Sequence, residues 1–173
     1  MEIIISIITA TGVIVALIQI TFLIIKNASD NKNIRRRDTI RAYNNIYRLT
    51  SELKNSFAKI SGNSEFKTDI IISSTVLSNK VMDYLTQIES FAVGINLKVY
   101  TLDVFIKLTS DDLCNNLSSL VKYIEYKRIE INYNKLFDES ISLINCICYI
   151  QNCKKQNIKI EHYKYIIPGR NDK

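Results

Sequence analysis

Glu89 is the side chain in this sequence best placed for acid or base chemistry, because it interrupts an otherwise apolar stretch, YLTQIESFAVGI at 84–95. A carboxylate buried among apolar side chains must be paired with a cation or take up a proton. Arg128, in the later segment YIEYKR, is the partner we expect. We therefore predict a buried structural pair, Glu89 with Arg128. The alternative, a functional acid, would require a polar pocket around Glu89.

Three cysteines near the C-terminus invite a metal interpretation. Cys146 and Cys148 would point about 200° apart on a helix, whereas Cys146 and Cys153 would share a face. Tetrahedral zinc sites usually combine ligand pairs two to four residues apart with a second pair elsewhere, and His162 is the only histidine. We predict buried thiols here, with no metal and no cofactor.

Other catalytic arrangements are missing from the sequence. A hydrolytic triad needs a histidine beside a nucleophile, and the four glycines form no phosphate-binding loop. Ser110, Asp111 and Asp112 are explained as a helix start, with a capping residue and two acids at the positive end. We predict no catalytic residue and a protein that is not an enzyme.

The N-terminal segment carries the strongest pattern in the chain. Residues 3–25, IIISIITATGVIVALIQITFLII, contain no charge, and as a helix they would be about 34 Å long, enough for a hydrocarbon core of about 30 Å. The sequence before this run has no basic residue and no cleavage site follows it, which argues against a signal peptide. We predict an uncleaved transmembrane anchor over 1–26.

Basic residues follow that run and none precedes it. Residues 26–60 hold nine Lys/Arg and three Asp/Glu, a net +6. The positive-inside rule then places the N-terminus outside and the rest in the cytoplasm, at the inner membrane of a cell. The residues expected to contact lipid headgroups are Lys26, Lys32, Arg35, Arg36, Arg37 and Arg41.

The arginine cluster lacks interleaved aromatics, so we expect no nucleic-acid binding. Four cysteines are compatible with thiols in a reducing compartment.

Small and polar residues form a stripe within the apolar run: Thr9, Gly12, Ala16 and Gln19 share one helical face. Membrane helices associate through close packing and interhelical hydrogen bonds, and Gly12 with Ala16 is a small-xxx-small pair. We predict self-association through this face and a homo-oligomer. Such residues are also common in spans that do not associate.

The remaining chain reads as helices. Residues 27–33 predict a basic juxtamembrane hinge, 34–153 a helical bundle and 154–173 a basic tail. A helix is expected from Ile34 to the break at 61–64, with a core-facing apolar stripe of Ala42, Ile46, Leu49, Leu53, Phe57 and Ile60. Helices are also expected from about Asn79 to Asn96 and after Thr101. Further helices are expected at about 111–131 and 134–152, while 65–78 could be a strand or a helix lead-in. The predicted fold class is all-α, with a single N-terminal transmembrane helix followed by a cytoplasmic helical bundle.

Two segments of this bundle, at 84–108 and 120–137, resemble a bacterial family, the domain of unknown function 4760. The residues that carry the resemblance are IESFAVGI at 88–95, LDV at 102–104, and Tyr123-Ile124 with Arg128. Aromatics often seen before the second segment are replaced by Asn115, Asn116 and Ser118. The resemblance covers about 76–148 and implies a helical fold in a bacterial membrane setting, without an activity.

These observations predict a membrane-anchored, non-enzymatic cytoplasmic interaction or sensing module with a protein partner. The alternative is a membrane-perturbing effector that forms a pore or depolarises the bilayer, with Thr9 and Gln19 lining the opening. Because some helical proteins of the resembled type occur near phage-defence genes, that alternative includes a role in phage defence.

Overall fold

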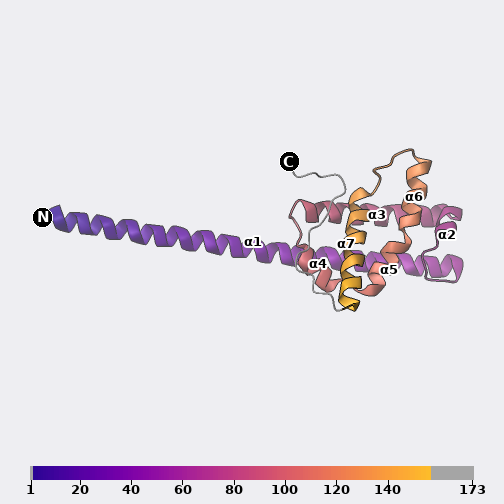
Figure 1. Ribbon diagram of the computed structural model, residues 1–173, viewed down its shortest axis with the longest axis horizontal. Coiled ribbons are helices and arrows are strands. Elements are labelled where there is room, and N and C mark those ends of the chain that lie inside the picture. Colours follow the sequence, from indigo (N-terminus) through magenta and orange to yellow (C-terminus); the bar gives the residue numbers. More distant parts are fainter. Residues whose placement is uncertain (1, 157–173) are drawn as a thin grey trace. The chain divides into compact units, whose positions relative to one another are not determined.

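The computed structural model describes the backbone of residues 2–156 and the side chains of residues 18–156, and over these residues it is helical with no strand (Figure 1). The chain divides into two units, one ending at Arg37 and the other beginning at Asp38, and each is described by itself. The all-α part of the predicted fold is therefore confirmed. Residues 65–78, the ambiguous segment, contribute helices rather than a strand.

The membrane-spanning part of the predicted fold is wrong. Among the described residues no helix is long and apolar enough to cross a membrane. Helix α1 (Glu2–Ser61) is long, but its described side chains begin at Ile18, and Lys26, Asp30 and Lys32 soon follow on the same helix. The residues expected to form a hinge, 27–33, are helical and continue α1 without interruption.

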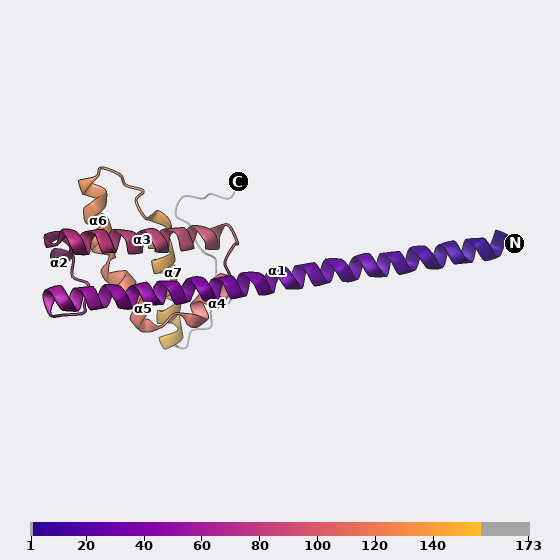
Figure 2. The same ribbon diagram turned by 180° about the vertical axis from the view of Figure 1, so that it is seen from behind.

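Helix α1 ends where the sequence predicts. Ser61 closes it, and Gly62 follows with φ +71°, a left-handed conformation that glycine adopts without a steric penalty. The short helix α2 (Thr68–Ser73) then leads to α3 (Thr75–Asn96), whose N-cap Ser74 accepts a hydrogen bond from the Leu77 backbone N–H. From residue 38 onward, α1 and α3 lie side by side (Figure 1 and Figure 2).

Four further helices complete the second unit: α4 (Leu102–Leu108), α5 (Asp111–Ser119), α6 (Val121–Glu130) and α7 (Asp138–Lys155). Ser110 caps α5 as expected, accepting from the Leu113 backbone N–H at 3.2 Å. The segment 111–131, which is predicted as one helix, forms two helices. They are separated at Leu120, whose side chain is fully buried. Helix α7 packs against α3 and α5.

One hydrophobic core holds the second unit together. Helix α1 contributes Ile46, Leu53 and Phe57, all at most 3% exposed, from the stripe predicted along it. Helices α3, α5 and α7 contribute Leu85, Ile88, Leu117 and Ile147 among others, and α2, α4 and α6 add further buried side chains. Ile60, predicted on the same stripe, is half exposed because it lies in the last turn of α1.

Candidate functional site

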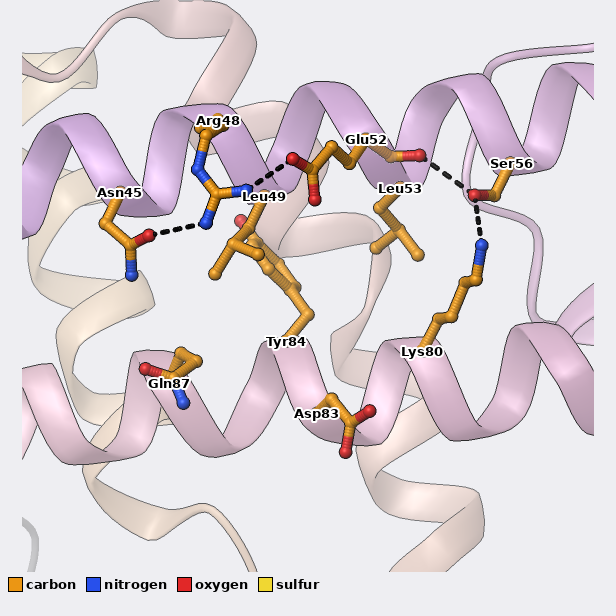
Figure 3. Close-up of a pocket in the computed structure, with 10 residues that line it drawn as sticks. All are labelled: Asn45, Arg48, Leu49, Glu52, Leu53, Ser56, Lys80, Asp83, Tyr84 and Gln87. Atoms are coloured by element: carbon orange, nitrogen blue, oxygen red, sulfur yellow. Dashed lines mark hydrogen bonds and ion pairs between the residues drawn. The ribbon is translucent and has the colours of Figure 1, made fainter.

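A groove of about 440 Å³ lies between α1 and α3, within the second unit (Figure 3). Its floor is apolar, formed by Leu49, Leu53 and the ring of Tyr84. Its edges are polar and charged, with Asn45, Arg48, Glu52 and Ser56 from α1 and Lys80, Asp83 and Gln87 from α3. The two helices run in opposite directions, as the contacts of Ser56 with Lys80 and of Thr50 with Tyr84 show.

The edges of the groove carry equal numbers of basic and acidic side chains, so their charges cancel. Arg48 pairs with Glu52 and also donates to Asn45 at 2.9 Å, while Lys80 donates to Ser56 Oγ at 2.8 Å. Asp83 is exposed and makes no hydrogen bond or ion pair within the described residues. An apolar floor between polar edges fits one face of an amphipathic segment.

Tyr84 fixes the base of the groove. Its hydroxyl lies 2.8 Å from Thr50 Oγ, which also donates to the Ile46 carbonyl at 2.8 Å. Burial raises the pKa of Tyr84 well above its usual range, so the phenol is neutral and can share a hydrogen bond inside the protein. Sequence reasoning missed this groove, because the stripe on α1 predicts a buried face but not which helix covers it.

Glu89 and Arg128 are not paired with each other, which corrects the buried pair expected from the sequence. Both side chains are half-buried. The carboxylate of Glu89 accepts from the Ser140 backbone N–H at 2.7 Å, from Ser140 Oγ at 2.6 Å and from the Glu139 backbone N–H at 3.4 Å. These donors lie in the first turn of α7, so Glu89 satisfies helix-terminal N–H groups from a neighbouring helix.

Arg128 contacts the segment just before that turn. Its Nε donates to the Leu136 carbonyl at 2.8 Å, and its guanidinium pairs with Asp138. Phe137, between these contacts, has φ +59° and supplies no side-chain cap to α7. Glu89 and Arg128 therefore hold the same short stretch of chain from two sides, and Glu89 does not line the groove.

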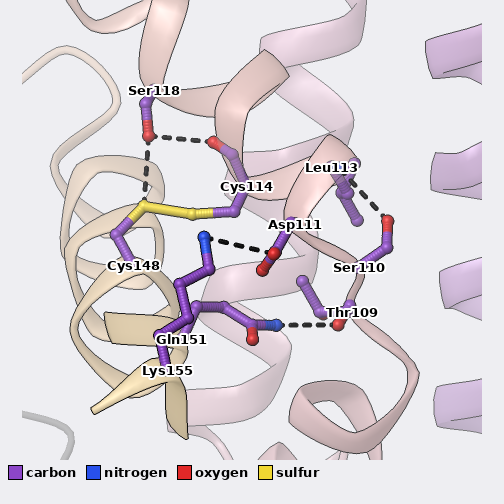
Figure 4. The surroundings of a disulfide bond; sticks show 9 residues. All are labelled: Thr109, Ser110, Asp111, Leu113, Cys114, Ser118, Cys148, Gln151 and Lys155. Atoms are coloured by element: carbon purple, nitrogen blue, oxygen red, sulfur yellow. Dashed lines mark hydrogen bonds and ion pairs between the residues drawn. A yellow bond between two sulfur atoms is a disulfide. The ribbon is translucent and has the colours of Figure 1, made fainter. Parts of the chain in front are cut away.

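The cysteines are arranged differently from the prediction. Cys114 on α5 and Cys148 on α7 form a disulfide with their Cα atoms 6.0 Å apart, so these two are not thiols (Figure 4). Cys146 is a half-buried free thiol and Cys153 a buried one. No group of three or more potential metal ligands occurs among the described residues. His162 and most of the predicted tail lie outside them.

Residues 18–37 of α1 are all exposed. The apolar side chains Phe22, Ile24 and Ile25 have 63–65% of their surface exposed, and Ile18, Ile20 and Leu23 lie between 53 and 63%. The predicted headgroup contacts are exposed too: Lys26, Lys32, Arg35, Arg36, Arg37 and, in the second unit, Arg41.

In the predicted self-association stripe, Gln19 is exposed, while the side chains of Thr9, Gly12 and Ala16 lie outside the described residues. Self-association and pore formation stay predictions.

A family described as a domain of unknown function, DUF4760, matches residues 6–145, which confirms the resemblance expected from the sequence over a longer stretch. No curated protein and no solved structure matches the chain.

Proposed function

The chain belongs to the family of the domain of unknown function DUF4760, and from that premise we propose a non-enzymatic interaction module that binds an anionic lipid surface through residues 18–37 of α1. One observation carries the proposal. Six exposed apolar side chains between Ile18 and Ile25 are followed directly by exposed basic residues from Lys26 to Arg37.

An exposed apolar cluster of this kind marks a site of protein or membrane contact. The charge beside it favours lipid, because an anionic surface attracts each nearby Lys or Arg by about 1 kcal/mol. A second copy of the same segment laid alongside in parallel would instead bring like charges together. Amphipathic and apolar segments flanked by Lys and Arg bind lipid surfaces through buried apolar area plus this electrostatic attraction.

Vesicle co-sedimentation tests the proposal with the full chain. We expect binding to vesicles containing phosphatidylglycerol to be stronger than binding to phosphatidylcholine vesicles, and to weaken with salt. Replacing Lys32, Arg36 and Arg37 by Gln removes about 3 kcal/mol of attraction, a loss of about 100-fold in affinity. A matched control replaces three exposed lysines of the helical unit, Lys98, Lys107 and Lys122, by Gln. Equal losses in both variants would contradict the proposal.

The apolar contribution has its own test. Replacing Phe22 and Ile24 by Ser should weaken binding to both kinds of vesicle, because it removes buried apolar area without changing charge. Binding unchanged by this replacement would leave only electrostatic attraction and would contradict an apolar contact with lipid.

The groove between α1 and α3 is the surface we propose for a protein partner. Its apolar floor and balanced charged edges suit an amphipathic helix, which would place its apolar face on Leu49 and Leu53. A photo-crosslinking residue at Gln87 in the groove should capture a discrete partner in cells, while the same residue at exposed Asn152 on α7 should not. Equal capture at both positions would contradict this assignment.

A further inference from the structure

We infer that Cys114 and Cys148 form a reversible dithiol site that a hydroperoxide oxidises to the disulfide, with Cys148 the thiol that is oxidised first. The two residues join α5 to α7, and their Cα separation of 6.0 Å lies in the range that a disulfide spans without backbone movement. This inference is independent of the lipid-binding proposal.

The two sulfur atoms have unequal surroundings. Cys114 is 6% exposed, whereas Cys148 is only half-buried on α7. The Ser118 hydroxyl lies 3.1 Å from Cys148 Sγ and also donates to the Cys114 carbonyl at 2.8 Å (Figure 4). Its greater exposure makes Cys148 the sulfur that a peroxide reaches first, and sulfenic acid forms on accessible thiolates that have a second cysteine close by.

Neither of the other two cysteines combines an accessible sulfur with a cysteine partner. Burial raises the pKa of the Cys146 thiol, which keeps it protonated and poorly nucleophilic. Cys153 is 5% exposed. Neither has a sulfur partner within the described residues. The structure therefore singles out one pair among four cysteines.

Noncovalent contacts hold α5 against α7 beside the disulfide, so the thiols stay adjacent after reduction. Gln151 on α7 donates to the Thr109 carbonyl at 2.8 Å, and Lys155 pairs with Asp111 at 3.1 Å (Figure 4). Leu117 on α5 and Ile147 on α7 belong to the common core. Because these contacts do not depend on the S–S bond, oxidation and reduction can alternate without unfolding.

The reaction balances with hydrogen peroxide as the oxidant. The Cys148 thiolate attacks one peroxide oxygen, the O–O bond breaks, and hydroxide leaves and takes up a proton to become water. The resulting sulfenic acid is attacked by the sulfur of Cys114, which forms the S–S bond and releases a second water. The two thiols lose two electrons, and a dithiol reductant returns them by thiol–disulfide exchange.

The experiment uses the full chain, reduced with dithiothreitol, freed of it, and treated with an equimolar amount of hydrogen peroxide. We expect loss of two thiols and a link between the tryptic peptides 108–122 and 136–154, both reversed by fresh dithiothreitol. The second peptide also contains Cys146 and Cys153. Protein with both of these replaced by Ser assigns the link to Cys148, and fragmentation of the wild-type peptide gives the same assignment if that variant folds poorly.

Dimedone, which labels sulfenic acid, tests which of the two thiols is oxidised first. Treated with peroxide, the Cys114→Ser protein should be labelled at Cys148, and the Cys148→Ser protein should show little label at Cys114. Three results would overturn the inference: a disulfide in the folded protein that dithiothreitol does not reduce, no link after peroxide, or stronger labelling at Cys114 than at Cys148.

Discussion

The carboxylate of Glu89 on α3 accepts both hydrogen bonds that Ser140 offers at the start of α7, from its backbone N–H at 2.7 Å and from its Oγ at 2.6 Å. The first N–H groups of a helix have no partner within it, and here Phe137 at the N-cap provides none. The carboxylate of Glu89, which belongs to α3, therefore caps the N-terminus of α7. This contact fixes where along α3 the helix α7 begins.

Glu89→Ala should lower the free energy of unfolding by about 2–3 kcal/mol, because it removes hydrogen bonds to a charged acceptor and leaves helix-terminal donors unpaired. Urea denaturation measures the change. Glu125→Ala, at an exposed position on α6, is the control and should stay within about 0.5 kcal/mol of the wild type. Two variants of equal stability would show that the cap contributes nothing.

Gly94→Ala should destabilise the protein, although alanine in a helix is normally favoured over glycine by about 1 kcal/mol. A Cβ at residue 94 would lie 2.5 Å and 2.6 Å from two ring carbons of Tyr100. Because overpacking of this kind costs about 1–3 kcal/mol, the sign of the effect should reverse. Thermal unfolding in a Tyr100→Leu background, where the ring is gone, should show a much smaller penalty. An equal penalty in both backgrounds would exclude the ring as the cause.

Tyr84→Phe should change how stability depends on alkaline pH. Burial raises the pKa of Tyr84 in the folded protein above the usual value of 10.0, so its neutral form stabilises the fold fully below pH 10. Above pH 10 the unfolded chain loses the proton first, and wild-type stability should fall by about 1.4 kcal/mol per pH unit for this group.

The Phe variant should lose less stability than wild type above pH 10. At pH 7 it should be less stable by about 1 kcal/mol, because Thr50 loses its partner hydroxyl. Urea denaturation from pH 8 to 11 gives both quantities, with Tyr133→Phe, at an exposed position, as the control. Parallel pH profiles for Tyr84→Phe and wild type would contradict the role of burial.

Cys114→Ser should reveal the contribution of the disulfide to stability. The bond closes a loop between residues separated by 34 positions, for which the chain-entropy relation gives about 3–4 kcal/mol. Oxidised wild type should exceed the variant by up to that amount in urea, and the gap should close once a reductant is added. A gap that persists under reduction would come from packing at residue 114 rather than from the cross-link.

The sequence predicted the helices best where the signal is local. Ser110 and the acids after it start α5, and Gly62 follows the end of α1, as expected. The sequence did not predict that the helix expected over 111–131 divides at Leu120, because the apolar spacing continues through the break. Packing against other helices decides where the helix divides. Residues 27–33, which the sequence predicts as a hinge, are helical, because polar residues without proline or glycine do not end a helix.

The partners of the chemically interesting residues depended on the tertiary structure. The sequence identified Glu89 and Arg128 as residues that need hydrogen-bonding or charged partners. Both side chains bind residues of the segment 136–140, and they do not bind each other. It identified the cysteines, but not that Cys114 and Cys148 meet across 34 positions.

The sequence by itself determined the all-α class, the family and the basic stretch after residue 25, because composition and local backbone preferences act over a few residues. Only the tertiary structure decided the groove, the cap on α7 and the cysteine pair, because each requires side chains distant in sequence to meet through the packing of a common core.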